Sequence, residues 1–501
     1  MSKLDPTITR RCVLGEDFTL FRAEFNGSVR IEARPESLTS DAGVIALRET
    51  LERLGMSDWL REHLTDQRSP LLITYPLVEL VRTAVLLLAQ GYRDHDDADV
   101  LRFDAAMRLA VSERKGVSPL EVPTRAEGTP APKNTANPEH LASQPTLSRL
   151  TAMLSGAADR IALREGLVEL AGRRIQADRG HRYRYLTVDV DSMPIEVHGH
   201  QPEAMYNGHY HETMYHPLVA TVGETGDLLD VELRRGNAHT AEGSLEFIEP
   251  LLDRVEKVMC QVAAVRIDAG FPDERLLGGL EKRQTPYVAR VRNNPVLDRM
   301  AEPHLHRPVG RRPVEPRIWL HEMTYQAQSW SRERRVVLVV LEREEDLFLH
   351  HFWLITNWSR DQVPAKELLE RYRKRGAAEG YMGELMSVLA PALSSSPRPK
   401  ATYAGKKPRE VKDSVDSFAV NEVRLLLNAW AYSVMHVGRT LMAKATGEGW
   451  SLQRFRERLL KVAARVLLHG RRVTVVIAQG AAPLWRSLWE QLAHLTWAQT
   501  G

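Results

Sequence analysis

A short segment that begins at Arg184 constrains the fold of this chain more than any other feature. In the sequence Arg-Tyr-Leu-Thr-Val-Asp-Val-Asp-Ser, apolar residues alternate with Thr187, Asp189 and Asp191. A period of two is typical of a β-strand with one buried face, and it places both acids on the same face. A buried carboxylate is costly unless it is paired or binds a metal ion. The segment therefore predicts a strand that carries a divalent cation site or, alternatively, ends in two solvated acids.

Composition is that of a globular protein of several domains, and it does not identify a partner. The 501 residues include 68 Lys and Arg against 65 Asp and Glu, which gives a net charge of only +3. The two cysteines, Cys12 and Cys260, offer no disulfide framework and no Cys-based zinc site, as in a reducing compartment. Apolar runs are too short to cross a membrane, and the first residues do not form a secretion signal. We therefore expect a cytoplasmic protein without membrane contact.

The chain after this segment alternates strands with helices. Strands are expected at 218–222, 228–233, 262–267 and 287–291, and helices at 240–258 and 273–282. The resulting order, strand-strand-strand-helix-strand-helix-strand, resembles that of an RNase-H-like sheet, in which the first and fourth strands are neighbours. Asp268 directly follows the fourth strand. The pattern therefore predicts that Asp268 shares one metal site with Asp191.

A second block of strands and a helix follow. Prolines interrupt 295–316, and strands are expected at 318–326, 335–341 and 347–356, so a β-rich module interrupts the α/β core. The helix that opens after Val363 carries Tyr372, Arg375 and Glu379 at positions i, i+3 and i+7, which share a face. Metal-dependent cleavage of a phosphodiester bond needs carboxylates that bind the metal ions and a positively charged side chain that binds the phosphate. An ordinary surface charge pair is the alternative reading.

The flanking regions have the character of DNA-binding segments. Residues 1–175 are expected to be mostly helical, at 41–54, 75–90, 146–154 and 158–171, with Ser40 and Asp41 as the first cap. Arginines in or next to the last two helices offer either a phosphate-binding face or a solvated one: Arg149, Arg160, Arg164, Arg173 and Arg174. A linker is expected at 116–144. A basic, mobile loop at 391–412 contains Lys406 and Lys407, which are candidates for phosphate contacts.

The C-terminal part is expected to close the fold. The pattern predicts a long apolar helix at 418–441, an amphipathic helix at 452–468, a strand at 471–477 and a helix at 482–495. Trp485 and Trp489 lie one turn apart on the last helix and are expected to pack against the rest of the protein.

Several motifs together resemble the DDE transposases of bacterial insertion sequences. Asp191, Asp268 and Glu379, in this order with a β-rich block before the glutamate, are similar to the catalytic triad of these enzymes. The following motifs resemble the family typified by insertion sequence 1380: Asp189-Val-Asp-Ser, Arg235-Gly-Asn-Ala-His-Thr-Ala-Glu-Gly, Arg266-Ile-Asp-Ala-Gly-Phe and Arg375-Gly-Ala-Ala-Glu. The resemblance covers most of the chain. One departure is Met386, which stands where the branch signature has a lysine.

The resemblance implies a fold, an activity and partners. The fold is α/β, with a helical DNA-binding region at 1–175, an RNase-H-like core at 176–294 and 361–445, a β-rich insertion at 295–360 and a helical region at 446–501. The activity is cleavage of transposon ends and joining of the 3′-hydroxyl ends to target DNA. Two Mg²⁺ ions, or Mn²⁺ as a substitute, would be held by Asp191, Asp268 and Glu379. The expected DNA contacts are Tyr372 and Arg375 of the motif and, from the basic loop and the N-terminal helices, Lys406, Lys407 and Arg149.

The implied partner is double-stranded DNA, at terminal inverted repeats and at the target, bound by a homodimer at the bacterial nucleoid. A catalytically inactive or domesticated DNA-binding relative is the alternative. Within the triad, Asp189 is the reserve for Asp191, and Glu384 lies near Glu379 but on another side of the helix. Branch relatives pass through a DNA hairpin, for which Trp330 or Trp353 could stack on a flipped base.

Overall fold

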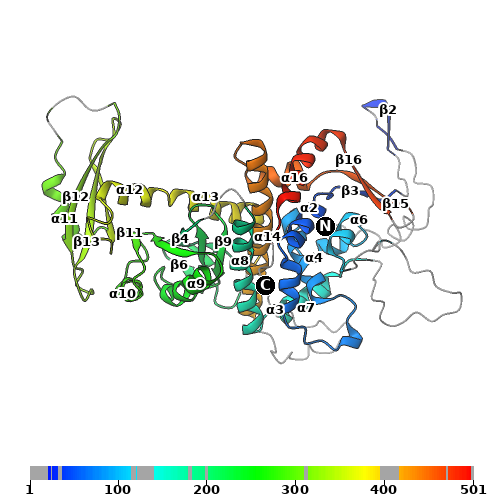
Figure 1. Ribbon diagram of the computed structural model, residues 1–501, viewed down its shortest axis with the longest axis horizontal. Helices are drawn as coiled ribbons and strands as arrows, with labels where there is room; N and C mark the ends of the chain where they lie inside the picture. Colours follow the sequence, from blue (N-terminus) through cyan, green and yellow to red (C-terminus); the bar gives the residue numbers. More distant parts are fainter. Residues whose placement is uncertain are drawn as a thin grey trace.

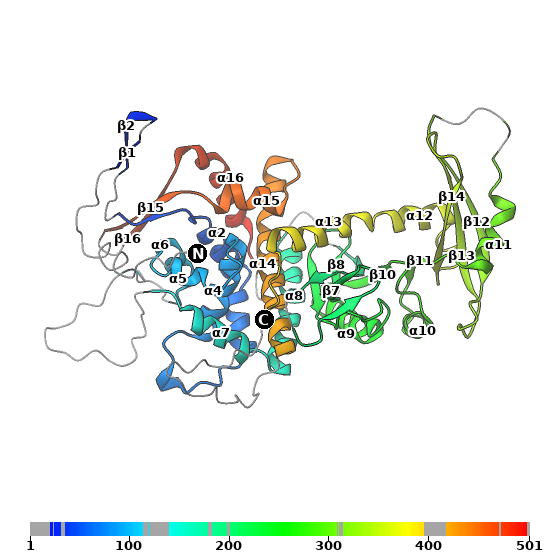
Figure 2. The same ribbon diagram turned by 180° about the vertical axis from the view of Figure 1, so that it is seen from behind.

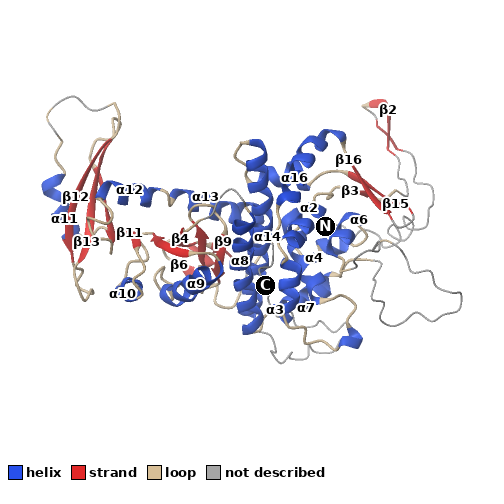
Figure 3. Ribbon diagram, in the orientation of Figure 1, coloured by secondary structure: helices blue, strands red, loops and turns tan. Residues whose placement is uncertain are grey.

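The computed structural model shows an elongated molecule with the strands β11–β13 (within residues 287–342) toward one end and most of the helices, together with the short strands β3, β15 and β16 (within residues 38–39 and 464–477), toward the other (Figures 1 and 3). It describes residues 21–23, 25–31, 36–113, 120, 140–178, 183–197, 201–307, 309, 314–394, 417–469 and 472–497. Most of the expected linker at 116–144, and the basic loop with Lys406 and Lys407, lie outside these residues. None of the helices in the described part of the chain has the length and hydrophobicity that a membrane crossing requires.

A mixed sheet of eight strands dominates the described residues, in the order β12-β13-β14-β11-β10-β4-β8-β9. The strands are β4 (Tyr185–Ser192), β8 (Leu218–Val222), β9 (Leu228–Glu232), β10 (Gln261–Ile267), β11 (Tyr287–Val291), β12 (Arg317–Tyr325), β13 (Arg334–Glu342) and β14 (His350–Thr356). Strands β4 and β10 are adjacent and parallel, and β8 pairs antiparallel with the other edge of β4. The predicted contact between the first and fourth strands is therefore confirmed.

The three strands expected to form an interrupting module continue this same sheet. Strand β14 pairs antiparallel with β11, and β12 and β13 extend the sheet beyond it. The sequence pattern identified the strands themselves but not their attachment, because alternation along one strand does not reveal its neighbour.

One face of the sheet packs against the helices that connect its strands. The side chains of Leu186, Val188 and Val190 are fully buried on this face, as the alternating pattern predicts. They share a core with α8 (Ala157–Ala177), α9 (Ser244–Val258) and α10 (Glu274–Lys282). Thr187, Asp189 and Asp191 consequently point to the opposite face.

The expected long helix after Val363 is divided into two helices. Helix α12 (Ala365–Arg373) packs Leu368 and Leu369 against the opposite sheet face, and α13 (Gly376–Glu384) follows it. Lys374 and Arg375 at the junction keep right-handed helical dihedral angles, so the two helices form one rod that runs toward α14 (Figures 1 and 2). A π-helical turn at Leu385–Leu389 ends the rod.

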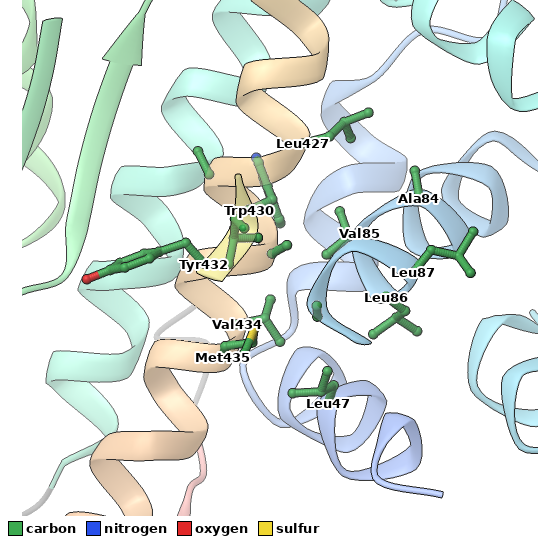
Figure 4. Close-up of a cluster of buried hydrophobic side chains, with 14 of the residues drawn as sticks. Leu47, Ala84, Val85, Leu86, Leu87, Leu427, Trp430, Tyr432, Val434 and Met435 are labelled. Atoms are coloured by element: carbon green, nitrogen blue, oxygen red, sulfur yellow. The ribbon is translucent and has the colours of Figure 1, made fainter. Parts of the chain in front are cut away.

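Helix α14 (Ser417–Thr446) is the centre of a second, helical core. Figure 4 shows Trp430 and Met435 of α14 facing Leu47 of α2 (Val44–Arg53) and Val85 of α4 (Leu77–Gln90). On its other side α14 packs against α8 (Figure 1), where Trp430 Nε1 donates to the Leu163 carbonyl at 3.0 Å. Helix α14 therefore joins the N-terminal helices to the sheet.

Further helices contribute side chains to the same core. Among them are α3 (Met56–His63), α6 (Ala105–Val111), α7 (Gln144–Met153) and α16 (Ala482–His494). Trp485 is buried and Trp489 partly buried against this core, so their expected packing role is confirmed. Short strands in the described residues include β1 (Phe21–Ala23), β2 (Asn26–Ile31), β3 (Leu38–Thr39), β5 (Ile195–Glu196), β6 (Met205–Asn207) and β7 (Glu212–Tyr215), and two more short helices are α5 (Asp97–Val100) and α11 (Pro295–Ala301).

The expected amphipathic helix at 452–468 is wrong in its second half. The helix consists of α15 (Leu452–Phe455) and a π-turn at Arg456–Leu460, after which the chain turns into β15 (Ala464–His469). Strand β15 pairs with both β16 (Arg472–Ile477) and β3, and these ladders satisfy the backbone in place of helical hydrogen bonds. The expected cap at Asp41 is also wrong, because its carboxylate accepts from Lys461 Nζ at 2.6 Å instead.

Four of the five arginines considered for DNA contact are held in ion pairs. They lie on α8, which is enclosed between the sheet and α14, so their charges are compensated within the protein. The pairs are Arg160–Glu422, Arg164–Asp230, Arg173–Glu169 and Arg174–Asp227. Arg149 on α7 is exposed. The expected arginine face is thus reduced to Arg149.

Replacement of Trp430 tests the role of α14. Trp430→Ala is expected to lower the free energy of unfolding by about 3–5 kcal/mol, because it leaves a cavity between α14, α8 and α4. Urea denaturation followed by circular dichroism measures this loss. Trp489→Ala, at a partly buried position of α16, is the matched control with a smaller expected loss. Equal losses for the two variants would contradict the central role of α14.

Candidate active site

Asp191 and Asp268 lie next to each other at the carboxyl ends of two parallel strands. The register places Arg266 of β10 opposite Asp189 of β4, so that Asp268 comes opposite Asp191 two residues further on. Neighbouring strands are about 4.8 Å apart. Backbone amides hold both carboxylates: Ser192 N donates to Asp191 Oδ1 at 2.9 Å, and Gly270 N donates to Asp268 Oδ1 at 2.7 Å. The strand ends therefore present the two acids together.

Helix α13 brings a third acid and an arginine to this edge. Arg375 is buried, and its Nη1 donates to Glu379 Oε1 at 2.8 Å. Its Nη2 donates to Asp191 Oδ2. Arg375 thus bridges the acid of β4 and the acid of α13, although these residues are far apart in the sequence. The side chain of Glu379 is 64% exposed, so the α13 side of this cluster is open to solvent.

The charges of the three acids act on one another. Burial raises the pKa of Asp191 to about 6, and the negative charges of Asp268 and Glu379 act in the same direction. Arg375 and the Ser192 amide act in the opposite direction and favour the ionised carboxylate. The site therefore concentrates negative charge, which an additional cation would stabilise.

The residue types in this cluster fit a magnesium site, but their present arrangement does not. Carboxylate oxygens are the ligands that Mg²⁺ prefers in proteins. Among the described residues, however, no three His, Cys, Asp or Glu side chains are grouped closely enough to hold a metal ion. Instead, the guanidinium of Arg375 pairs with both Asp191 and Glu379.

The structure separates the role of Asp189 from that of Asp191. Both carboxylate oxygens of the buried Asp189 accept hydrogen bonds from Arg266, whose Nη1 also donates to the Arg371 carbonyl at 2.9 Å. A Cβ atom at Gly223 would lie 2.4 Å from Arg266 Nη2, so a glycine is needed beside this pair. Asp189 therefore joins β4 to β10 and α12, and the geometry favours Asp191 as the acid of the site.

Two positions near Glu379 belong to the structural core. Glu384 accepts hydrogen bonds from Arg439 of α14 and, at 2.9 Å, from the Leu452 amide. Met386, at the position of the lysine in the branch signature, packs against the helical core. Neither residue contributes to the acidic cluster.

Two tyrosines lie beside the acids, and one was not anticipated. The pKa of Tyr372 is raised by burial, with Asp268 and Glu379 also raising it and Arg375 lowering it. Tyr210, in the loop between β6 and β7, has its pKa raised by burial and by Asp191 and Asp268. The charges of both strand-end acids therefore act on its hydroxyl group. Nothing in the spacing of this loop marks Tyr210, because its position depends on the fold of a small separate sheet.

The other predicted DNA contacts are not brought to this edge. Arg149 lies on α7, which Figures 1 and 2 place beyond α8 and α14 from β4. The predicted contacts Lys406 and Lys407 lie outside the described residues. Trp330 and Trp353 are buried in the core of the sheet, so the suggestion that they stack on a flipped base is wrong.

Stability measurements distinguish the two aspartates of β4. Asp189→Ala is expected to destabilise the protein by about 3–5 kcal/mol, because Arg266 would remain buried without its partner. Asp191→Ala is expected to change stability much less, because Glu379 still pairs with Arg375. Thermal denaturation of both variants at pH 7 gives the comparison. A larger loss for Asp191→Ala would reverse the assignment of the structural acid.

Comparisons with known proteins identify the family. A search of curated proteins gave no match. Among solved structures, the chain is similar to that of a cryo-EM structure of the piggyBac transposase synaptic complex with hairpin DNA, with 11% identity and a TM-score of 0.39, over 85% of this chain and 82% of that chain. The family model described as "Transposase DDE domain group 1" matches residues 21–398 and 408–499. The chain therefore belongs to the DDE transposase family.

Proposed function

We propose that this transposase cleaves the phosphodiester bond at each end of a mobile DNA segment and joins the freed 3′-hydroxyl groups to target DNA. The observation that carries the proposal is the convergence of Asp191, Asp268 and Glu379 from β4, β10 and α13 at one edge of the sheet. The motifs resemble those of the bacterial family typified by insertion sequence 1380, which we propose as the branch. Its site of action would be the cytoplasm, at the nucleoid.

We propose further that the catalytic core is RNase-H-like. The strand order β9-β8-β4-β10-β11, with β4 parallel to β10 and β10 parallel to β11, supports this reading. In open sheets with parallel strands, functional groups commonly gather outside the carboxyl ends of the strands. Asp191 and Asp268 occupy such a position. The helices of residues 1–175 would supply DNA binding, and strands β12–β14 of the insertion would extend the core sheet.

The chemistry follows from the charges of the cluster. Two Mg²⁺ ions, or Mn²⁺, held by Asp191, Asp268 and Glu379, would activate the attacking oxygen and stabilise the leaving oxygen of the phosphodiester. Arg375 presents a planar fork that suits a phosphate group. Tyr372 lies beside Arg375 and Asp268, where it would limit the path of the DNA strand. No covalent enzyme intermediate is proposed: water and then the freed 3′-hydroxyl group would attack the phosphorus directly, so the phosphate would pass from one oxygen atom to another.

The proposed partner is double-stranded DNA, both at terminal inverted repeats and at the target, with two copies of the protein in the synaptic complex. Contacts are proposed for Tyr372 and Arg375 at the site, for Arg149 on α7, and for Lys406 and Lys407. A DNA-binding relative without activity is the rival function. The position of Arg375 between two acids, together with Met386 in place of lysine, favours this rival. A cleavage assay decides between the two.

Each acid of the cluster is expected to be essential for cleavage. Asp191→Asn, Asp268→Asn and Glu379→Gln should each reduce Mg²⁺-dependent cleavage of end DNA by at least about 100-fold while DNA binding is retained, because metal ligands act on chemistry. Glu370→Gln, an exposed acid on α12 outside the cluster, is the control and should cleave normally. A variant that retains full cleavage would remove its residue from the site. Absence of cleavage by the wild-type protein under all metal conditions would favour the rival function.

Binding measurements test the helical region. Arg149→Ala is expected to weaken binding of end DNA about 3- to 10-fold at low salt and to reduce the slope of log K against log salt by about one. A gel-shift titration at several salt concentrations gives both values. Arg486→Ala, which removes an exposed arginine from α16, is the matched control. Equal effects of the two changes would argue against a specific contact on α7.

A further inference from the structure

Arg375 occupies the place of a cation among the acids of the site. Its guanidinium donates to Asp191 on one side and to Glu379 on the other, and its side chain is only 9% exposed. Its backbone amide donates to the Tyr372 carbonyl at 2.9 Å, which holds the residue at the junction of α12 and α13. The positive charge therefore compensates the acids in the protein without DNA.

This arginine differs from Arg174 and Arg266, two other buried arginines of the sheet region. Arg266 is enclosed by Asp189 and the Arg371 carbonyl, and its partner Asp189 is only 2% exposed. Arg174 pairs with Asp227, whose side chain is 3% exposed. Glu379, in contrast, is 64% exposed. One side of the Arg375 pair is therefore accessible to an incoming group, whereas the Arg174 and Arg266 pairs are enclosed.

The surface of α13 next to Glu379 leaves room for such a group. Gly376 and Gly383 lie three residues before and four residues after Glu379, so all three share a helix face. A Cβ atom added at either glycine would meet nothing within 4 Å. An incoming DNA backbone can thus approach Glu379 and Arg375 without displacing side chains from this face.

We propose that Arg375 keeps the acids closed to metal ions in the free protein, and that a phosphate of bound DNA draws its guanidinium away and opens them. The inference rests on the function proposed above. DNA binding would then be required before the acids can bind metal ions. A DDE transposase with this arrangement would bind metal ions weakly in the absence of DNA.

Two physical arguments support this order of events. The same oxygens of Asp191 and Glu379 cannot bind the guanidinium and a metal ion at once, and a divalent cation beside an arginine is repelled by it. A phosphate group offers the planar fork of arginine a pair of anionic oxygens, so Arg375 can exchange its carboxylate partners for equivalent ones. By linkage, DNA then raises metal affinity by the same factor by which metal raises DNA affinity.

Metal affinity without DNA provides the first test. Mn²⁺ binding to the full-length protein is followed by electron paramagnetic resonance, which detects the free ion. Arg375→Met and Arg375→Gln are expected to bind Mn²⁺ at least about 10-fold more tightly than the wild type, because the competing cation is gone. Two variants are used so that misfolding of one, monitored by circular dichroism, does not decide the outcome. Unchanged or weaker binding in both folded variants would overturn the inference.

Control variants locate the effect. Arg371→Met removes an arginine one turn earlier on α12 that pairs with Glu367 and lies over the ring of Trp358, and it should leave Mn²⁺ affinity unchanged. Asp191→Asn combined with Arg375→Met should lose the gain, since the gain requires the acids. A tighter site in Arg371→Met, or one that persists without Asp191, would also overturn the inference.

DNA coupling provides the second test. With a duplex selected from a random pool by binding to the wild-type protein, DNA is expected to tighten Mn²⁺ binding of the wild type about 10-fold and to leave Arg375→Met unchanged. Equal Mn²⁺ affinity of the wild type with and without this duplex would refute the coupling. The proposed function is judged separately by cleavage: loss of cleavage in Asp191→Asn without any DNA effect on metal binding would retain the function and reject the inference.

Discussion

The repulsion among three carboxylates, offset by one guanidinium, is the interaction on which the site of this protein depends. Asp191 and Asp268 are forced together by the parallel pairing of β4 and β10, and α13 adds Glu379. Without a cation the cluster would destabilise the protein, because solvent screens the repulsion between partly buried like charges only weakly. Arg375 supplies the compensation in the protein without DNA. The same arrangement makes the acids ready for cations once Arg375 has another partner.

The helix that carries Arg375 and Glu379 is fixed at both ends and in the middle. Just before its start, Arg266 connects the Arg371 carbonyl of α12 to Asp189 and thus to β4. In the middle, the ring of Tyr381 lies against Gly226 in the turn between β8 and β9, where any Cβ atom would be only 2.4 Å from the ring. At its end, Glu384 pairs with Arg439 of α14. These contacts fix the Glu379 position relative to both the sheet and the helical half.

Buried ion pairs are therefore used in two ways in this protein. Arg164, Arg174 and Arg266 have enclosed partners and hold α8, the β8–β9 hairpin, β4 and β10 together. Breaking such a pair leaves a charge without compensation, which is strongly destabilising. Arg375 has one exposed partner, so its pair can be exchanged for another. The distinction lies in the surroundings of each arginine, since the residue type is the same.

The sequence by itself determined the strands of the sheet, the adjacency of β4 and β10 and the convergence of Asp191 with Asp268. These features follow from periodicity, from chain order and from the neighbour rules for parallel strands, which are local or topological properties. The motif around Arg375 likewise predicted a helix that carries Glu379. The pattern did not predict that this helix is divided into α12 and α13.

Only the tertiary structure decided which charged groups meet. Asp189 and Asp191 share a strand face, and the periodicity of the strand does not distinguish them, but Arg266 of the adjacent strand lies opposite Asp189. The arginines of α8 were candidates for a DNA-binding face, yet acids of α14, of the sheet region and of α8 itself pair with them. The charges of Asp191 and Asp268 act on Tyr210, which lies in a loop with no pattern of its own. Residues 464–469 form a strand because β16 and β3 lie beside them. Periodicity states which side chains share a face, and it contains no information about the groups that pack against that face.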